Sequence, residues 1–535
     1  MKKTTLRHRM AALGTAAVLT LATACGSSAD GGTTATGTSG GTGTVASATA
    51  FMTLDDTHAD TDDGDYSADG ATTIALADGG TEVDGDGATV KGDVVTITTA
   101  GTYIVSGTLT DGQIVVDSPG DGKVDIVLDN ADITSASTSP LVVTEADEAV
   151  VILAADSVNS LADAAASTAD DDSDDAPTAT LFSMADLTIA GTGTLEVAGN
   201  SNDGIASKDG LVILSGTIDV TATDDGIRGK DYLVIAGGTL DVTSGGDGLK
   251  SDNETEGEPG TVQLDAGQVT ISAGDDGVDA IGAINVADGT LTVAKSTEGL
   301  EAAQISIADG TVDVTAQDDG INATNGETAG GGEDAQEGVL ASISGGDVHV
   351  VVAQGDGIDS NGSATITGGT TVVEAGSAGG GGTGSLDVNG SFPVTGGTLV
   401  ALGGMSSAPS TDSDEGWVAA TLTTPAEAGQ VVAVVDSDGD VVARYVVPEA
   451  TSSVIVAAEG ITNGQDHDLY VGDAGSDTGF STGGSTSGLT KAGTVTAGEF
   501  TGGMGGGRGG GPRGGDGGGP GGPPEDDTSA GSGTT

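Results

Sequence analysis

An acidic residue followed by glycine and an aliphatic residue recurs through the middle of the chain. The tripeptide stands at residues 203–205, 225–227, 247–249, 276–278, 298–300, 319–321 and 356–358, so that its glycines are 22, 22, 29, 22, 21 and 37 residues apart. If each repeat is one coil of a stack, the carboxylates of successive coils lie about 4.8 Å apart. Unit charges at that distance repel by about 0.9 kcal/mol in water, and more strongly near a protein surface, so a neutralising partner is expected.

A second column stands two residues after each glycine, and it holds Arg228, Lys250, Asp279, Glu301, Asn322 and Asp359. Arg228 and Lys250 can offset charge directly and are our candidates for contacts with an anionic ligand. Further along the repeat both columns are acidic, and converging carboxylates with corner carbonyls suit Ca²⁺, which takes about six to eight oxygen ligands. The candidate calcium ligands are Asp275, Asp276, Asp279, Glu298, Glu301, Asp318, Asp319, Asp356 and Asp359. The alternative is that these acids only form tight Asp-Gly corners and keep the surface soluble.

The composition narrows the class of protein. The 535 residues include 81 Asp and Glu but only 15 Lys and Arg, which gives a formal charge of −66. This charge excludes an ordinary nucleic-acid binder, because such proteins neutralise phosphates with cations. Glycine contributes 96 residues, whereas Phe, Trp and Tyr contribute 5, 1 and 5. Small aliphatic side chains must therefore fill the core.

The elements that position the two columns follow from the period of the repeat. A further glycine, mostly followed by Thr, stands ten or eleven residues before the next acidic corner, at residues 216, 238, 267, 289, 310 and 346. Residues 239–243 alternate between polar and apolar side chains, which is typical of a short half-buried strand. Three short strands and three corners in about 22 residues predict one coil of a parallel β-helix, whereas a β-propeller blade needs about 40 residues.

These patterns divide the chain into five parts. Residues 51–404 are expected to form the all-β, three-sided parallel β-helix, and residues 405–472 a small antiparallel β unit that covers the last open edge. Residues 473–535 are rich in glycine and are expected to be disordered. Residues 1–25 are predicted to be a signal peptide, and residues 26–50 a Gly/Ser/Thr tether.

The N-terminal segment predicts export and lipid anchoring. Lys2, Lys3, Arg7 and Arg9 precede an uncharged stretch that ends in Cys25, the single cysteine of the chain. The residues before Cys25 are similar to a bacterial lipobox, in which the cysteine is lipidated after cleavage, although Ala22 stands where the usual Leu is expected. An ordinary signal peptide with a chance cysteine is the alternative. We expect a monomer on the extracellular face of the cell membrane, attached through this anchor alone.

Residues 101–103, 106–109, 111–116, 127–129 and 133–135, together with the repeated corner and the Gly-rich tail, resemble a family of bacterial carbohydrate-binding-domain proteins. The resemblance implies a pectate-lyase-like, right-handed parallel β-helix. It also implies calcium-bound, non-catalytic recognition of plant-type polysaccharides, including acidic ones. The scarcity of aromatic residues argues against stacking on neutral glucan chains.

Two other functions stay open. A calcium-dependent uronate lyase would use Arg228, Lys230 or Lys250 to abstract a proton, but each has an acidic neighbour that would hold it as a charged partner. A calcium-stiffened surface stalk or adhesin would need no sugar site. None of the four histidines lies near a Ser or Cys nucleophile motif, so a non-catalytic protein is the preferred interpretation.

Overall fold

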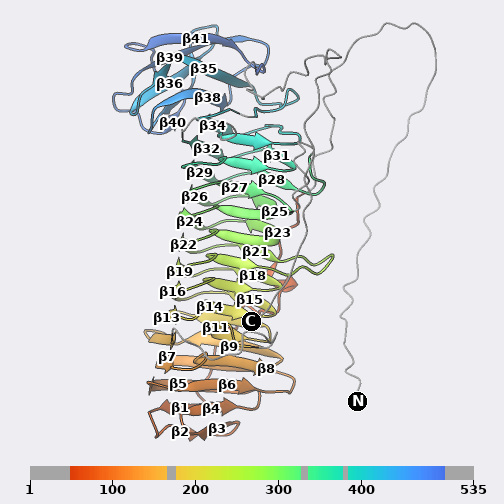
Figure 1. Cartoon of the computed structure of the whole chain (residues 1–535), viewed down its shortest axis with the longest axis vertical. Helices are drawn as coiled ribbons and strands as arrows, with labels where there is room; N and C mark the ends of the chain where they lie inside the picture. Colours follow the sequence, from red (N-terminus) through yellow and green to blue (C-terminus); the bar gives the residue numbers. More distant parts are fainter. Residues whose placement is uncertain (1–47, 165–175, 327–334, 377–383, 406, 501–535) are drawn as a thin grey trace, which may run out of the picture. The chain divides into compact units, whose positions relative to one another are not determined.

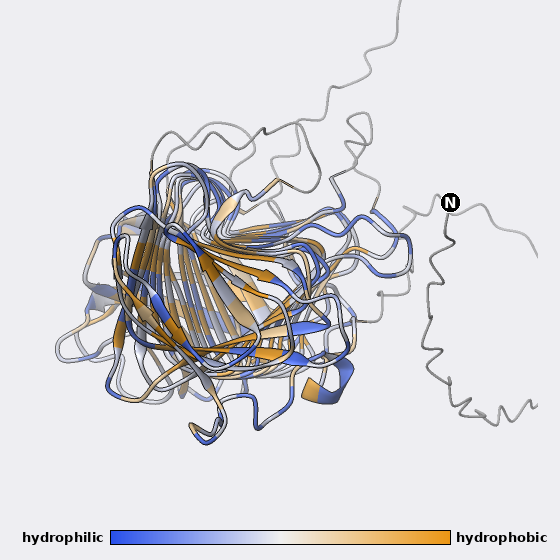
Figure 2. Ribbon diagram, turned by 90° about the horizontal axis from the view of Figure 1, so that it is seen from below, coloured by the Kyte–Doolittle hydropathy of each residue, from blue (hydrophilic) through white to orange (hydrophobic). Residues whose placement is uncertain are grey.

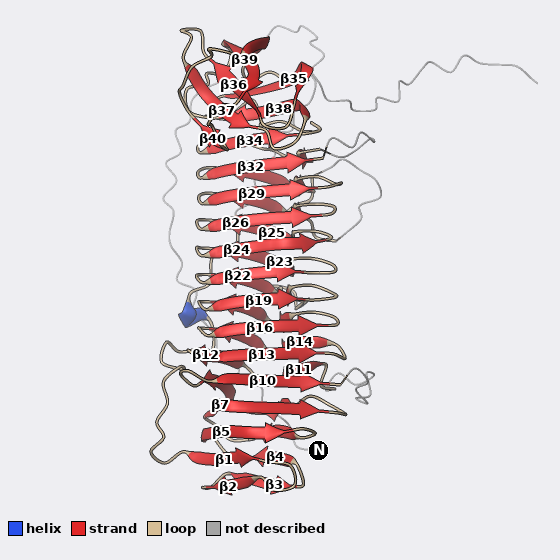
Figure 3. Cartoon of the chain, turned by 90° about the vertical axis from the view of Figure 1, so that its left-hand side faces the viewer, coloured by secondary structure: helices blue, strands red, loops and turns tan. Residues whose placement is uncertain are grey.

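The computed structural model describes residues 48–164, 176–326, 335–376, 384–405 and 407–500. Cys25, the predicted signal peptide, most of the predicted tether and residues 501–535 lie outside this part of the chain. Within it the architecture is all-β, with one short 3₁₀ turn, η1 (Leu54–Asp56). No helix there is long and apolar enough to cross a membrane. Parallel strands stack coil upon coil, from the end that carries β2 and β3 to β34 (Figures 1 and 3).

Each coil has three walls, which confirms the predicted three-sided parallel β-helix. Wall 1 follows the acidic corner and contains β4 (Val94–Ile97), β6 (Gln113–Asp117), β8 (Leu141–Glu145), β11 (Ala179–Ser183), β14 (Asp203–Ser207), β17 (Ile227–Gly229), β20 (Leu249–Ser251), the first part of β23 (Val278–Val286) and of β25 (Leu300–Ile307), β27 (Ile321–Ala323), β30 (Ile358–Ser360) and β33 (Leu386–Val388).

Wall 2 comes next along each coil. It contains β1 (Thr72–Leu76), β5 (Gly101–Leu109), β7 (Lys123–Ser135), β9 (Glu148–Leu153), β12 (Leu187–Gly191), β15 (Gly210–Ile213), β18 (Tyr232–Ile235), β21 (Thr261–Leu264), the second part of β23 and of β25, β28 (Leu340–Ile343) and β31 (Ser363–Ile366). At the first coil, β2 (Glu82–Asp84) pairs antiparallel with β1, and β3 (Ala88–Lys91) pairs antiparallel with β4.

Wall 3 closes each coil before the next acidic corner. It contains the ends of β5 and β7, then β10 (Val158–Asp163), β13 (Thr194–Gly199), β16 (Thr217–Ala222), β19 (Thr239–Thr243), β22 (Gln268–Ser272), β24 (Thr290–Ser296), β26 (Thr311–Ala316), β29 (Asp347–Val352), β32 (Thr370–Ala375) and β34 (Thr398–Leu402). The glycine before this wall turns the chain: Gly238 has φ +96°, and a Cβ there would lie 2.8 Å from the Gly216 carbonyl oxygen of the preceding coil.

The core is a column of aliphatic side chains, because every second residue of a wall points inward. Ile218, Leu240 and Val269 occupy one register position on three successive coils and are at most 1% exposed. Burying one such side chain contributes about 1.5–3 kcal/mol. Figure 2 looks along the stack and shows hydrophobic residues recurring in the strands that enclose this core. The large aromatic side chains Tyr103, Phe182 and Trp417 are also fully buried.

Two antiparallel strands cover the last edge of wall 3. β38 (Thr451–Ala457) pairs with β34 on one side and with β35 (Trp417–Ala426) on the other. A second sheet follows, in the order β40 (Phe480–Ser481), β37 (Val441–Val446), β36 (Gln430–Val435), β39 (Asp466–Asp473) and β41 (Thr490–Thr496). The expected boundary at residue 472 is therefore wrong, because Thr490–Thr496 pairs with β39 despite its Gly-rich surroundings.

Residues 48–63, which we call the strap, run along the outside of wall 2 instead of forming a coil, so the β-helix does not begin at residue 51 as expected. The Thr49 backbone N–H and hydroxyl both donate to Gln304 Oε1, each at 2.6 Å. Further down the stack, Met52 and the Gln263 side chain exchange two hydrogen bonds of 2.8 and 2.7 Å. The strap thus crosses wall 2 from β25 toward the first coils.

The lower part of the strap is held by packing and charge. Ala59 packs against Val212 and Val234, which point outward from wall 2. Lys123 Nζ, on β7, lies 3.0 Å from Asp60 Oδ2 and 2.5 Å from Asp63 Oδ1. The same amine lies 3.1 Å from Glu148 Oε1 on β9.

Replacing Lys123 with Met should lower the melting temperature by several degrees. The Asp63 and Glu148 side chains are only 5% and 11% exposed, and removing one partner of a buried ion pair costs about 3 kcal/mol. Lys491→Met is the matched control, because Lys491 and Asp468 are 47% and 33% exposed and such a pair contributes at most about 1 kcal/mol. Scanning calorimetry of both variants checks this, and equal shifts would contradict a stabilising strap.

Candidate functional site

The acidic corners lie on successive coils at the start of wall 1. Wall 1 pairs Ile205 with Ile227, Leu249 with Val278, and so on to Ile321 with Ile358. This register aligns the predicted acids into the acidic ladder: Asp203, Asp225, Asp247, Asp276, Glu298, Asp319 and Asp356. It also aligns the second column, hereafter the outer column: Arg228, Lys250, Asp279, Glu301, Asn322 and Asp359, followed by Asp387.

Glycine is required at these corners because the coils approach closely. A Cβ on Gly226 would lie 2.3 Å from Val242 Cγ1 and 2.6 Å from the Gly248 carbonyl oxygen of the next coil. Any larger residue would push adjacent coils apart, so close packing requires the glycine of these Asp-Gly corners.

Ladder carboxylates also stabilise the corners. The backbone N–H of Asp247 donates to Asp225 Oδ1 at 3.0 Å, and that of Asp276 donates to Asp247 Oδ1 at 3.0 Å. The same bond joins Asp356 N–H to Asp319 Oδ1 at 2.5 Å. The turn-forming role that we considered as an alternative is thus real for these residues. It uses one oxygen of each carboxylate and leaves the second for another partner.

The lower half of the ladder is neutralised by the chain's own cations. Lys250 Nζ lies 3.5 Å from Asp225 Oδ2 and 3.5 Å from Asp279 Oδ2, and it hydrogen-bonds to Asp247. Arg228 makes two hydrogen bonds to the Asp252 carboxylate, one of them 3.1 Å from Nε to Oδ1. Both predicted ligand-binding cations are therefore held in ion pairs.

The upper half has no such partners. Among the described residues, no Lys, Arg or His nitrogen lies within 4.0 Å of the carboxylates of Glu298, Glu301, Asp319, Asp356 or Asp359. Asn322 lies between them: its Nδ2 donates to Glu298 Oε2 at 2.6 Å and to Glu301 Oε2 at 3.2 Å. Asn322 is 8% exposed, and its Oδ1 is buried without a hydrogen-bond partner.

Burial and mutual repulsion make these acids hard to ionise. Burial, followed by Asp247 and Glu298, raises the pKa of Asp276 to about 8. Burial and the adjoining Glu298 raise the pKa of Glu301 to about 9. The pKa of Asp359 rises to about 7 from burial and the neighbouring acids. A cation bound here would reduce this repulsion and lower these pKa values.

The donor set suits a hard cation. Glu298, Glu301 and Asn322 carry carboxylate and amide oxygens on successive coils, and Ca²⁺ prefers such ligands. No three acidic side chains of the described ladder, however, have oxygens within 4.8 Å of one another. Asn322 was not among the predicted ligands, because a lone amide in an acidic column gives no signal of its own. Of the predicted ligands, Asp276, Asp279, Asp319, Asp356 and Asp359 line the same corner, whereas Asp275 and Asp318 are exposed.

Residues 91–338 match the family model of the carbohydrate-binding domain-containing proteins. A curated protein of that description from Acetivibrio thermocellus (strain ATCC 27405) is 38% identical over 137 residues, which are 26% of this chain and 48% of that protein. The chain thus spans about half the length of the curated relative that it matches. A solved structure of a polysaccharide lyase-like protein from C. thermocellum, a gadolinium derivative, is 32% identical with a TM-score of 0.39, and the match covers 45% of this chain and 94% of that chain.

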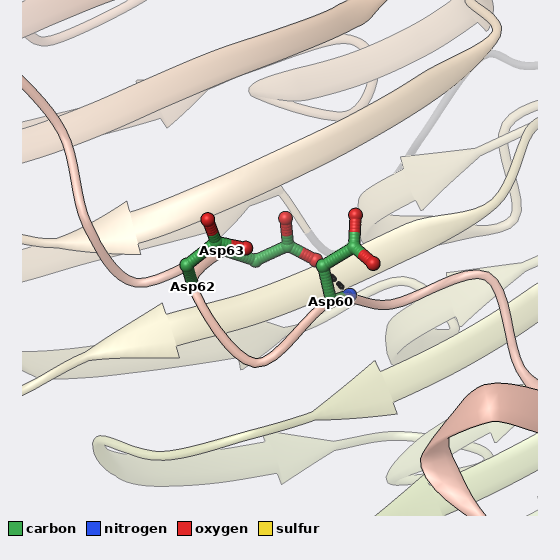
Figure 4. Close-up of side chains that lie close together, drawn as sticks. All are labelled: Asp60, Asp62 and Asp63. Atoms are coloured by element: carbon green, nitrogen blue, oxygen red, sulfur yellow. Dashed lines mark hydrogen bonds between the residues drawn. The ribbon is translucent and has the colours of Figure 1, made fainter.

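The carbohydrate-binding-domain match contains the acidic ladder from Asp203 to Asp319, and Asp356 lies beyond it. Another acidic group lies outside it, in the strap. The oxygens of Asp60, Asp62 and Asp63 lie within 4.8 Å of one another, the only acidic trio of this kind in the described part of the chain (Figure 4). Lys123 Nζ contacts Asp60 and Asp63 and offsets part of this charge, and the Asp60 N–H donates to Asp63 Oδ2 at 2.7 Å. We therefore assign this trio to holding the strap.

Proposed function

We propose that this protein is a non-catalytic carbohydrate-binding protein that recognises acidic polysaccharides through Ca²⁺. The observation that carries the proposal is the upper half of the acidic ladder and outer column. There, none of five carboxylates has a Lys, Arg or His nitrogen within 4.0 Å among the described residues, and the buried Asn322 side chain donates to two of them. Calcium supplies positive charge there and bridges to the carboxylates of a uronate polymer. With a formal charge of −66, the protein repels a polyanion unless a cation intervenes.

The test is retention on immobilised polygalacturonate. We expect the full chain to bind in millimolar calcium and to elute with a chelator, because the bridge depends on the ion. Binding that is equal with and without chelator would contradict the calcium bridge. Calcium uptake without any retention would favour the stalk or adhesin instead.

A uronate lyase is the second candidate, and one observation favours it. Burial and then Arg228 lower the pKa of Lys208, although Asp252 and Asp203 oppose the shift, and a lowered pKa is what a proton-abstracting amine needs. Unsaturated uronate ends absorb ultraviolet light, so the same incubation with polygalacturonate can be followed by absorbance. We expect no increase with time, and a steady increase would establish the lyase.

Anchoring through Cys25 is also part of the proposal. The tether would hold the protein at the extracellular face of the membrane, where polysaccharides are accessible. Replacing Cys25 with Ser removes the thiol that carries the lipid, so we expect the variant in the culture medium and the wild type in the membrane fraction. An immunoblot of both fractions checks this, and membrane retention of the variant would rule out the lipobox.

A further inference from the structure

Two lysines that directly follow wall 1 strands, Lys208 and Lys230, form no ion pair within the described part of this acid-rich chain. Nine of the 15 Lys and Arg residues lie among the described residues, and five of them form ion pairs: Lys123, Arg228, Lys250, Arg444 and Lys491. Four others have no carboxylate within 4.0 Å in the described chain: Lys91, Lys208, Lys230 and Lys295.

Lys208 and Lys230 are neighbours on consecutive coils. Wall 1 pairs Ser207 with Gly229, so the residues that follow them occupy the same position, one coil apart. Both side chains are half-buried. Burial and then Arg228 lower the pKa of Lys208, Asp252 and Asp203 oppose this shift, and Lys230 adds to it, so the three cations lie near one another with two acids in the vicinity.

The partner that could neutralise them is already used. The next residue in their column is Asp252, and its carboxylate accepts both hydrogen bonds from Arg228. Asp203 lies near Arg228, but the distance from Asp203 Oδ2 to Arg228 Nη1 is 3.9 Å. Asp203 Oδ2 makes no hydrogen bond to any described residue. Charged amines that occupy equivalent positions on adjacent coils repel each other. An anion that contacts both amines would remove this repulsion.

We propose that Lys208 and Lys230 form a carboxylate-binding subsite that contacts uronate groups directly, without a metal ion. This inference rests on the proposed function and specifies how one acidic chain is held along wall 1. Its carboxylates meet amines at the coils of β14 and β17 and calcium at the coils of β25 to β30. Lys250 on β20, with its ion pairs, lies between the two regions.

The test compares two double variants of the full chain. Lys208→Gln with Lys230→Gln should weaken binding to polygalacturonate in saturating calcium by roughly tenfold, because two charge-assisted contacts are lost and water replaces part of each. Calcium uptake, measured by isothermal calorimetry, should not change. Lys91→Gln with Lys295→Gln removes the same charge at unpaired lysines elsewhere and should bind like the wild type.

Two further measurements make the result specific. Lys208→Arg with Lys230→Arg keeps the charges and should restore binding, which excludes a folding defect. Fully methyl-esterified polymer has no free carboxylates, so the wild type and the Gln variant should bind it with the same affinity. Wild-type affinity of the Gln variant, or an equal loss in the Lys91 and Lys295 control, would overturn the subsite alone. A wild type that binds no polygalacturonate would instead overturn the proposed function.

Discussion

In the presence of a chelator, the melting temperature of the β-helix should fall as the pH rises from about 5 to about 9. In the folded chain, burial and neighbouring acids raise the pKa of Asp276 to about 8 and that of Glu301 to about 9, from ordinary values of 3.8 and 4.5. Between these limits the folded chain binds more protons than the unfolded chain. The stability that these protons confer is complete below about pH 4 and is lost as the pH rises through the folded values.

Calcium should remove most of this fall, because it binds the deprotonated carboxylates of the folded chain. We expect a decrease of roughly 5–10 °C in chelator, given that about 1 kcal/mol changes the melting temperature of a large domain by about 2–4 °C. Scanning calorimetry at constant ionic strength, with chelator and with excess calcium, measures both curves. A chelated protein whose melting temperature is constant or rises over this range would leave the ladder acids as corner formers alone.

Replacing Glu301 with Gln and Asp359 with Asn should abolish most calcium-dependent binding. These outer-column residues flank Asn322 on consecutive coils, and the amide replacements keep their shape while removing two charged ligands. With six to eight ligands needed, we expect the calcium affinity to fall by roughly 10- to 100-fold and retention on polygalacturonate to fall with it. Isothermal calorimetry and the retention assay measure the two effects separately.

The control for this variant lies on wall 3. Asp219 and Asp241 are exposed and paired on consecutive coils, so Asp219→Asn with Asp241→Asn makes a comparable change of charge away from the ladder. We expect this variant to take up calcium and bind polymer like the wild type. If both double variants lose binding equally, net charge is the cause and the site does not lie on wall 1.

The fold could be predicted because each coil repeats the same short sequence pattern. A glycine with a positive φ before wall 3, an alternating strand and an acidic corner recur in sequence, and the stacked register follows from their spacing. The strap has no such period. Its contacts join Thr49 to Gln304 across 255 residues, and no local pattern indicates such a pairing.

The sequence predicted which charged residues align on successive coils, but it did not predict which of them form ion pairs with one another. Arg228, Lys230 and Lys250 look equivalent in sequence, since each lies beside acids. The structure distinguishes them because Asp252, in the loop after β20, pairs with Arg228, whereas Lys230 forms no ion pair with any described residue. Likewise, Asn322 donates both of its hydrogen bonds through Nδ2 to two glutamates and leaves Oδ1 without a partner among the described residues. The sequence alone gives no sign of this arrangement.

The strap determines how the molecule would respond to a pulling force. A load that draws residue 48 away from wall 2 reaches the Thr49 and Gln304 contact first, then the Met52 and Gln263 pair, and only later the charges around Lys123. Because these contacts are loaded one after another, the strap should peel at low force. The coils behind it, whose strands bond to both neighbours, would bear no load until the strap had been released.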